Sequence, residues 1–206
     1  QPLDSSTILI VLPNELEDLQ KSEKFTNIKI EKIITYPNGE PGFYFIHLQY
    51  TEKVGEIFAR EKAARHELIG GDFLLQDGSP VGVHYSPMDM GTIQDVLDGN
   101  PMTIARSWES NPFRFIFDFQ EPRIINQISL RVGGEPTRIE IDLWQNMDTE
   151  PTQYSLDLKE KPDPRLTTID VNLPQPVIKA EIRVYNENES EPAHVHVWEI
   201  RFLPDR

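Results

Sequence analysis

Residues 113–119 read Phe-Arg-Phe-Ile-Phe-Asp-Phe, with a phenylalanine at every second position. Side chains of a β-strand point alternately to its two faces, so all four rings project to one side. The same alternation of apolar residues recurs in runs centred on Leu130, Ile141, Leu156, Val171 and Ile182. Clusters of Pro, Gly, Asn or Asp separate these runs, and no helical pattern lies between them. The pattern therefore predicts an antiparallel sandwich of two sheets.

The part of the chain before Pro87 mixes helical and strand patterns. The expected elements are a strand over 7–12, a helix from Pro13, strands over 27–36 and 43–50 joined by the Asn38-Gly39 turn, a helix over 54–69 stopped by Gly70-Gly71, and short strands over 73–75 and 81–85. No helical pattern follows Pro87. We therefore expect two domains, a small α+β domain over 1–87 and an all-β antiparallel sandwich over 88–206.

Composition excludes several classes of function. The 206 residues contain 20 Lys and Arg against 34 Asp and Glu, which gives a net charge of −14. This charge disfavours a nucleic-acid partner and an anionic lipid surface. The absence of cysteine excludes disulfides, thiol catalysis and Cys-ligated zinc. The longest apolar run, residues 8–12, is too short for a membrane helix, and the start at Gln1 leads us to expect a piece of a longer protein.

The last apolar run changes parity along its length. Val195 and Val197 occupy odd positions, whereas Ile200 and Phe202 occupy even positions. One strand can bury both pairs on the same face only if it contains a bulge or bend near Trp198-Glu199. Bulges often lie beside binding sites. The alternative is that the sheet buries one pair and a loop buries the other.

The segment 95–103 has side chains that suit a hard cation. Asp98, Asn100 and Thr103 carry side-chain oxygens around a turn at Gly99. Calcium prefers such oxygen ligands, and Glu199 at the bent strand could complete the shell. The alternative is an ordinary Asp-Gly-Asn turn, with Glu199 paired to a basic neighbour.

Three features resemble the discoidin, or coagulation-factor C-type, domains. They are Asp98-Gly99-Asn100-x-x-Thr103, the Phe-alternating strand, and the terminal run from Val195 to Phe202. These domains belong to the galactose-binding-like jelly rolls, which include many carbohydrate-binding modules. The resemblance therefore implies a jelly roll, and it implies a structural calcium ion that joins the two ends of the domain.

The ligand set for that ion is also what the resemblance implies. It comprises the carbonyls of Asp95, Asn100 and Trp198, the side chain of Asp98, both oxygens of Thr103, and the carboxylate of Glu199. The chain departs from the family in one respect. The family often has Trp two residues after the Thr, where this chain has Ala105.

A second resemblance covers nearly the whole chain. Residues 36–45, Asp89-Met90-Gly91, 103–106 and Asn111-Pro112-Phe113 resemble the soluble C-terminal region of bacterial polytopic glycosyltransferases, which are similar to dolichyl-phosphate-mannose protein mannosyltransferases. In those enzymes a membrane bundle holds the catalytic carboxylate. The resemblance implies an extracytoplasmic location, tethered to the membrane through the parent protein. Nothing catalytic is carried over to these residues, and no direct membrane insertion by them is expected.

Arg106, Trp108 and Glu109 follow the Thr103 loop and could form a carbohydrate-binding platform, with Tyr154 or Tyr185 as further candidates. Aromatic rings stack on sugars, and planar polar groups form paired hydrogen bonds. The alternative is that the first domain covers Trp108. His194-x-His196 is a possible transition-metal pair, but no third ligand lies nearby in the sequence, which favours a solvent-facing pair.

The sequence lacks the usual catalytic motifs. It contains no G-x-S-x-G, no phosphate-binding G-x-x-x-x-G-K and no D-x-D. We therefore expect a non-catalytic domain pair that binds carbohydrate or positions a glycosylated acceptor. The alternatives are a structural or protein-interaction module, which would expose a large apolar patch, and a polysaccharide hydrolase, which would hold two carboxyl groups across a cleft.

Overall fold

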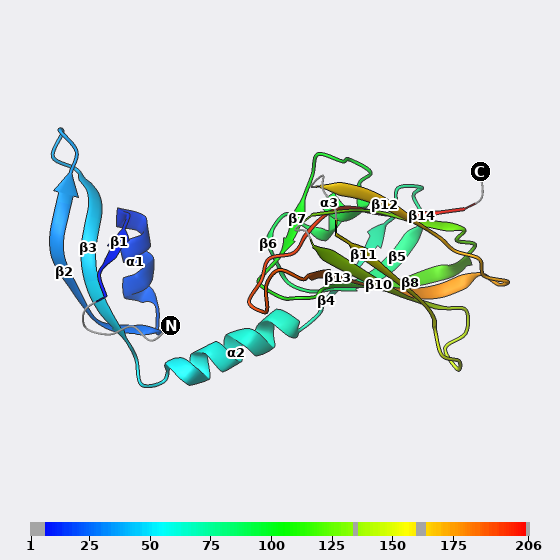
Figure 1. The fold of residues 1–206 in the computed structure, drawn as a ribbon, viewed down its shortest axis with the longest axis horizontal. Coiled ribbons are helices and arrows are strands. Elements are labelled where there is room, and N and C mark those ends of the chain that lie inside the picture. The colour runs from blue at the N-terminus through cyan, green and yellow to red at the C-terminus, as the bar shows by residue number, and fades with distance from the viewer. Residues whose placement is uncertain (1–6, 134–135, 160–163, 205–206) are drawn as a thin grey trace. The chain divides into compact units, whose positions relative to one another are not determined.

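The computed structural model describes residues 7–133, 136–159 and 164–204. The chain divides after Ala64 into two compact units, which Figure 1 shows with their elements labelled. The first unit contains β1 (Leu9–Val11), α1 (Pro13–Lys21), β2 (Phe25–Thr35), β3 (Pro41–Tyr50) and most of α2 (Val54–His66). No described helix is long and apolar enough to span a membrane.

The first unit is a three-stranded antiparallel sheet, in the order β1-β3-β2, with α1 packed on one face. Pro13 opens α1, and the carboxylate of Glu15 accepts the N–H of Leu12, 2.7 Å away. The buried core consists of Val11, Leu16, Ile46 and Leu48. This core is small for a folded unit.

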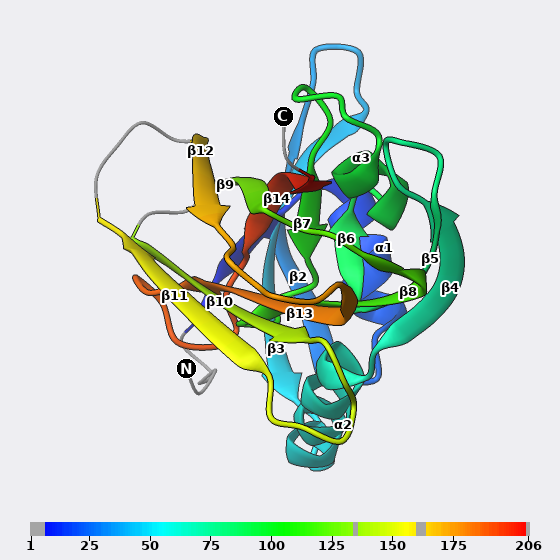
Figure 2. The ribbon, with the colours of Figure 1, turned by 90° about the vertical axis from the view of Figure 1, so that its right-hand side faces the viewer.

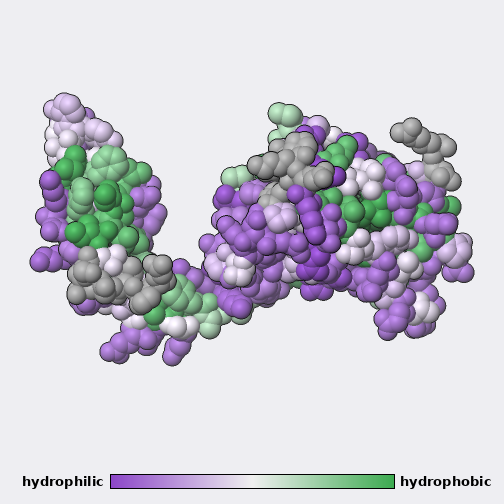
Figure 3. Space-filling view, in the orientation of Figure 1, coloured by the Kyte–Doolittle hydropathy of each residue, from purple (hydrophilic) through white to green (hydrophobic). Residues whose placement is uncertain are grey.

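The other face of this sheet is apolar and open. Cross-strand register places Ile10 beside Phe45 and Ile34 beside Phe43, on the face opposite to Ile46. Ile10 is 61% exposed and Phe43 is 42% exposed. Figure 3 shows hydrophobic atoms gathered on the visible side of this unit.

The second unit is a sandwich of two antiparallel sheets, shown from one end in Figure 2. One sheet has the order β11-β10-β13-β8-β5-β4 and the other β12-β9-β14-β7-β6. The elements are β4 (Ile69–Leu74), β5 (Pro80–Tyr85), β6 (Met88–Met90), α3 (Ile93–Leu97), β7 (Ala105–Ser107), β8 (Phe113–Arg123), β9 (Gln127–Gly133), β10 (Thr137–Trp144), β11 (Thr152–Leu158), β12 (Arg165–Asp170), β13 (Val177–Asn186) and β14 (His196–Leu203).

The phenylalanines of β8 form the centre of the sandwich. Phe113, Phe115 and Phe117 are 0% exposed and Phe119 is 8% exposed. The ring of Phe202 on β14 meets Phe117 and Phe119 edge-on, with centroids 4.9 and 5.1 Å apart. One sheet thus packs on the other through these rings, which confirms the sandwich predicted from the alternation.

The expected domain boundary after Pro87 was wrong. The hairpin of β4 and β5 joins the large sheet, because β5 pairs with β8 and aligns Val83 with Phe117. The sandwich unit therefore starts at Arg65, and Gly70 and Gly71 lie inside β4. Local periodicity shows that a hairpin exists, but it does not show which sheet the hairpin joins.

A short helix, α3, was also missed. The carboxylate of Asp95 accepts hydrogen bonds from the backbone N–H and the hydroxyl of Thr92, at 2.7 and 2.9 Å, and so caps the first turn. Ile93, Val96 and Leu97 are buried against the sandwich. A helix of five residues is too short for its period to stand out in the sequence.

The last strand contains the irregularity that its parity predicted. The register of β14 against β9 shifts between Val197 and Glu199. Val197 and Ile200 are both 0% exposed, so the bulge turns residues of opposite parity into the same core. Glu199, at the bulge, is 5% exposed.

Candidate functional site

The loop 98–103 brings several oxygen atoms to one point. The hydroxyl oxygen of Thr103 lies 2.8 Å from the carbonyl of Asn100 and 3.2 Å from that of Asp95. It also lies 3.1 and 3.2 Å from the two carboxylate oxygens of Asp98. A hydroxyl has one proton to donate, so most of these oxygens face each other without a hydrogen between them. Such a group of lone pairs suits a hard cation.

The bent strand lies against this loop. A Cβ atom built on Gly99 would lie 3.7 Å from the carboxylate of Glu199. The guanidinium of Arg201 donates to that carboxylate, with Nε 2.6 Å from Oε1, and to the carbonyl of Gly99 at 3.0 Å. The basic neighbour that the sequence left open for Glu199 is thus Arg201.

The residues expected to bind calcium therefore fit an oxygen-only site in part. Asp95, Asp98, Asn100 and Thr103 converge through the hydroxyl of Thr103, and Glu199 lies beside Gly99. The side chain of Asp95 caps α3, so only its carbonyl faces the loop. In the described part of the chain, no group of three or more His, Cys, Asp or Glu could hold a metal. A cation here would depend on carbonyl and hydroxyl oxygens in addition to the carboxylates of Asp98 and Glu199.

Arg106 is the most firmly oriented of the residues expected to bind carbohydrate. It lies on β7, where its Nε and one Nη donate to the two carboxylate oxygens of Asp89 at 2.8 and 3.0 Å. These hydrogen bonds raise the pKa of Arg106 above its ordinary value. The paired contact fixes the plane of the guanidinium. The side chains of Arg106 and Asp89 are 27% and 26% exposed, so both reach the surface.

His194 belongs to the same cluster. Its Nδ1 lies 3.2 Å from the carbonyl oxygen of Ser107 and 3.8 Å from the carboxylate of Asp89. Because a carbonyl only accepts, Nδ1 carries the proton, and Nε2 is the atom that can address a ligand. His196 lies instead against Trp198, with ring centroids 6.1 Å apart. The two histidines therefore have different surroundings.

Trp108 and Glu109 lie on the turn after β7, and Arg65 contacts both. The guanidinium of Arg65 lies 5.9 Å from the centroid of the Trp108 ring and forms an ion pair with Glu109. Glu109 has a φ of 56°, in the left-handed region. Arg65 belongs to the second unit, so a residue of the sandwich unit itself partly covers Trp108.

Sequence reasoning did not assign Asp89 and Arg65 to this cluster. Asp89 appeared only within the Asp89-Met90-Gly91 motif, and Arg65 lay in an expected helix of the first domain. Both act through pairing of segments far apart in the chain, namely β6 with β7 and the end of α2 with the turn after β7.

The outer face of the large sheet carries two neighbouring carboxylates that lie beside the same depression. Glu140 and Asp142 line a depression of about 270 Å³. Arg183 binds both, at 3.1 and 2.8 Å. Burial opposes ionisation of Glu140, but hydrogen bonds from Tyr185 and Arg183 outweigh it and lower the pKa of that carboxyl. A glycosidase acid needs a raised pKa, so Glu140 does not suit that role.

No protein-family model matches the chain, and no curated protein matches it. Solved structures do resemble the sandwich. "CBM32 of AlyQ in complex with 4,5-unsaturated mannuronic acid" has 16% identity and a TM-score of 0.45, and covers 59% of this chain and 92% of that one. The "Lectin Domain of Lectinolysin complexed with Lewis B Antigen" has 8% identity and a TM-score of 0.47, and the match covers 60% of this chain and 92% of that one.

A third similar structure is "CpGH89CBM32-6 produced by Clostridium perfringens", with 16% identity and a TM-score of 0.45. The match covers 61% of this chain and 94% of that one. These likenesses concern the sandwich fold. No residue role and no ligand is carried over from them.

Proposed function

We propose that the chain is a non-catalytic, carbohydrate-binding region, in which the sandwich holds saccharide or a glycosylated acceptor. The observation that carries this proposal is the cluster of Asp89, Arg106 and His194, with Trp108 on the adjoining turn. A guanidinium fixed in its plane donates to hydroxyl groups, the imidazole Nε2 accepts, and an indole provides an apolar surface for a sugar ring.

Calorimetric titration of the whole chain against a broad panel of saccharides tests this proposal. We expect dissociation constants between millimolar and micromolar, weakened about tenfold by Arg106→Ala or Trp108→Ala. The matched control is Trp144→Ala, because Trp144 lies on β10 and also has a cation, Lys179, beside its ring. Silence across the panel, or equal losses in the control, contradicts the proposal.

The finer proposal is that the parent protein is a membrane glycosyltransferase, similar to the mannosyltransferases named above. This region would lie outside the cytoplasmic membrane and would be tethered to it through that parent. The sequence resemblance over residues 36–45, 89–91, 103–106 and 111–113 supports it. In intact cells that make the full-length parent, protease added outside the cytoplasmic membrane should cleave this region. Protection from the outside, with cleavage only after lysis, contradicts this location.

Calcium belongs to the same proposal. The ion would be held by the carbonyls of Asp95, Asn100 and Trp198, the side chain of Asp98, both oxygens of Thr103 and the carboxylate of Glu199. It would join the loop to the bent strand, as Arg201 does by donating to both the carboxylate of Glu199 and the carbonyl of Gly99. Its role there is structural.

A second candidate function, a protein-interaction module, is favoured by the open apolar face of the first unit. Its partner would be a second copy of the chain, joined through β2, an edge strand of the sheet. Antiparallel pairing of two β2 strands about Ile30 places Lys29 of each copy opposite Glu31 of the other.

Sedimentation at increasing concentration tests this second candidate. We expect the chain to self-associate. Lys29→Glu alone should weaken this association, and the double substitution of Lys29→Glu together with Glu31→Lys should restore it. A monomer at every concentration contradicts it.

A further inference from the structure

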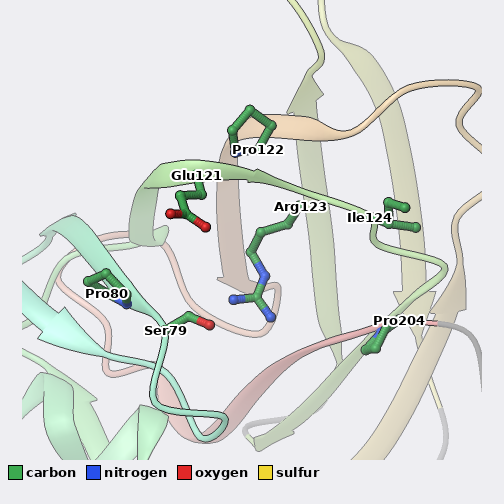
Figure 4. Close-up of a pocket in the computed structure, with 7 residues that line it drawn as sticks. All are labelled: Ser79, Pro80, Glu121, Pro122, Arg123, Ile124 and Pro204. Carbon is green, nitrogen blue, oxygen red and sulfur yellow. The ribbon is translucent and has the colours of Figure 1, made fainter.

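A cavity of about 390 Å³ opens at the end of β8, between the β4–β5 turn and the end of the chain's last strand. Its lining comprises Ser79, Pro80, Glu121, Pro122, Arg123, Ile124 and Pro204. Figure 4 shows the guanidinium of Arg123 projecting into the space between Ser79 and Pro204, with the carboxylate of Glu121 directed toward it. Cavities of this size accommodate small ligands.

Arg123 is held in place before any ligand arrives. It donates to the carboxylate of Asp77, and its guanidinium lies 5.8 Å from the centroid of the Phe119 ring. Asp77 is in turn fixed by the N–H of Ser79, which donates to it at 2.9 Å in the turn at Gly78. A donor that is already oriented loses little conformational entropy when a ligand binds.

The lining combines a guanidinium, a carboxylate, the hydroxyl of Ser79 and apolar walls. Arg123 offers N–H donors, and Glu121, which is exposed, offers acceptor oxygens on the same strand. Pro80, Pro122 and Pro204 contribute saturated rings, and Ile124 is 65% exposed beside them. A pyranose has the complementary surfaces, because its vicinal hydroxyls both donate and accept while its C–H face is apolar.

We propose that this cavity is a saccharide site for neutral sugar rings, separate from the cluster around Arg106. The proposal shares its ligand class with the proposed function, but it depends on different residues. A neutral sugar suits the site because Glu121 faces the cavity and the whole chain carries a net charge of −14. Because the charge of Arg123 is already balanced by Asp77, a uronate carboxyl would be repelled by Glu121 and by the charge of the whole chain.

The cavity continues toward the loop 98–103. A second depression of about 360 Å³ shares Arg123 and Pro204 with it and reaches Gln76, Gly99 and Arg201. The two together can hold more than one sugar ring, so the ligand class is a neutral oligosaccharide.

The two saccharide sites lie at different ends of β14. Arg106 pairs with His196, at the start of the strand, whereas Pro204 directly follows its end. Eight residues of extended chain separate these points, which corresponds to about 25 Å. The sites are therefore far enough apart to be distinguished by mapping.

Amide NMR titration of the whole chain tests the proposal, with neutral tetrasaccharides of glucose, galactose and mannose as probes and tetragalacturonate as the charged comparison. We expect saturable shifts at residues 79, 121, 123 and 124 with at least one neutral probe. Glu121→Gln and Arg123→Ala should each weaken that binding about tenfold, whereas Trp108→Ala should leave it unchanged. Because Glu121 is exposed, Glu121→Gln serves where Arg123→Ala fails to fold.

The outcomes separate the two saccharide sites. Shifts at 79, 121, 123 and 124 without shifts at 106–108 support this cavity and contradict the proposed function at Arg106. Shifts only at 106–108 support the proposed function and overturn the cavity. Tighter binding of tetragalacturonate than of the neutral probes, or loss of binding at the cavity through Trp108→Ala, also overturns it.

Discussion

The two units differ most in how their apolar side chains are used. The sandwich buries its phenylalanines between two sheets, and Phe113, Phe115 and Phe117 are inaccessible. Among its described residues, the first unit buries the cluster of Val11, Leu16, Ile46 and Leu48, together with Ile57 on α2, and it leaves the second face of its sheet exposed. A thick core makes a rigid frame on which polar groups can be fixed, whereas a thin core leaves apolar surface for contact with another molecule.

The polar groups of the sandwich show this rigidity. Arg106, Arg123 and Arg201 each form an ion pair with a carboxylate of the same unit. The first unit has its own ion pairs: that of Lys24 with Glu61 is 29% and 23% exposed, whereas that of Lys21 with Glu17 is 69% and 67% exposed. Comparable features should therefore respond differently to substitution in the two units.

The largest expected effect is in the sandwich core. Phe117→Ala should lower the free energy of unfolding of the sandwich by about 3–5 kcal/mol, because it removes a ring that contacts Phe115 and Phe202. Tryptophan fluorescence in denaturant measures this change selectively, since Trp108, Trp144 and Trp198 all lie in the second unit.

The matched change in the first unit is Ile46→Ala, which should leave the tryptophan transition in place and shift only the circular dichroism of the first unit. If Ile46→Ala lowers the tryptophan transition as much as Phe117→Ala does, the two units do not fold separately.

The second effect concerns calcium. If calcium at a hundred times its dissociation constant binds the loop, it should stabilise the sandwich by about 2.7 kcal/mol relative to EDTA. Asp98→Ala should abolish the difference, and Ile46→Ala should not change it. Identical unfolding of the wild type in calcium and in EDTA excludes the ion.

Sequence periodicity was sufficient to predict the fold where the structure depends on local alternation of apolar and polar residues. The four phenylalanines of β8 are buried as predicted, and the parity change at Trp198-Glu199 is due to a bulge, one of the two explanations that the sequence left open. The boundary after Pro87 was wrong because β5 pairs with β8 and carries β4 with it into the large sheet, and such a long-range pairing leaves no local pattern. Short α3 was missed for the related reason that five residues give no periodicity.

The candidate site was predictable only in part. Spacing brought Asp98, Asn100 and Thr103 together, because all three lie in one turn. The partners of Arg106 and Trp108 come from β6 and from the end of α2, so no spacing rule could assign Asp89 or Arg65 to them. The roles of all these residues in binding remain predictions.

The third effect is a dependence on pH in the sandwich. A hydrogen bond from Arg123 lowers the pKa of Asp77 from 3.8 to about 2. The stabilisation is therefore fully present above pH 3.8 and is lost as the pH falls through 2. The Asp77 side chain is 51% exposed, so solvent screening limits the contribution to about 1 kcal/mol or less.

Unfolding of the wild type and of Asp77→Asn, followed by tryptophan fluorescence from pH 2 to 7, measures this contribution. The two curves should differ at neutral pH and converge near pH 2. A difference that persists at pH 2 contradicts the assignment to this pair.

The smallest effect is expected on α1 of the first unit. Glu17→Ala removes the ion pair with Lys21, one turn along the helix, and should change the stability of that unit by about 0.5 kcal/mol or less. Circular dichroism in denaturant measures it. A loss above about 1 kcal/mol would show that this unit depends on its surface charges more than its exposure indicates.

The account rests on the claim that the sandwich, and not the first unit, binds saccharide. The direct measurement is an amide NMR map of the whole chain, titrated with the saccharide that binds most tightly in the calorimetric panel. We predict shifts at Asp89, Arg106, Trp108 and His194, with none in residues 7–64. Shifts confined to the first unit, or no shift at saturating saccharide, would contradict the account.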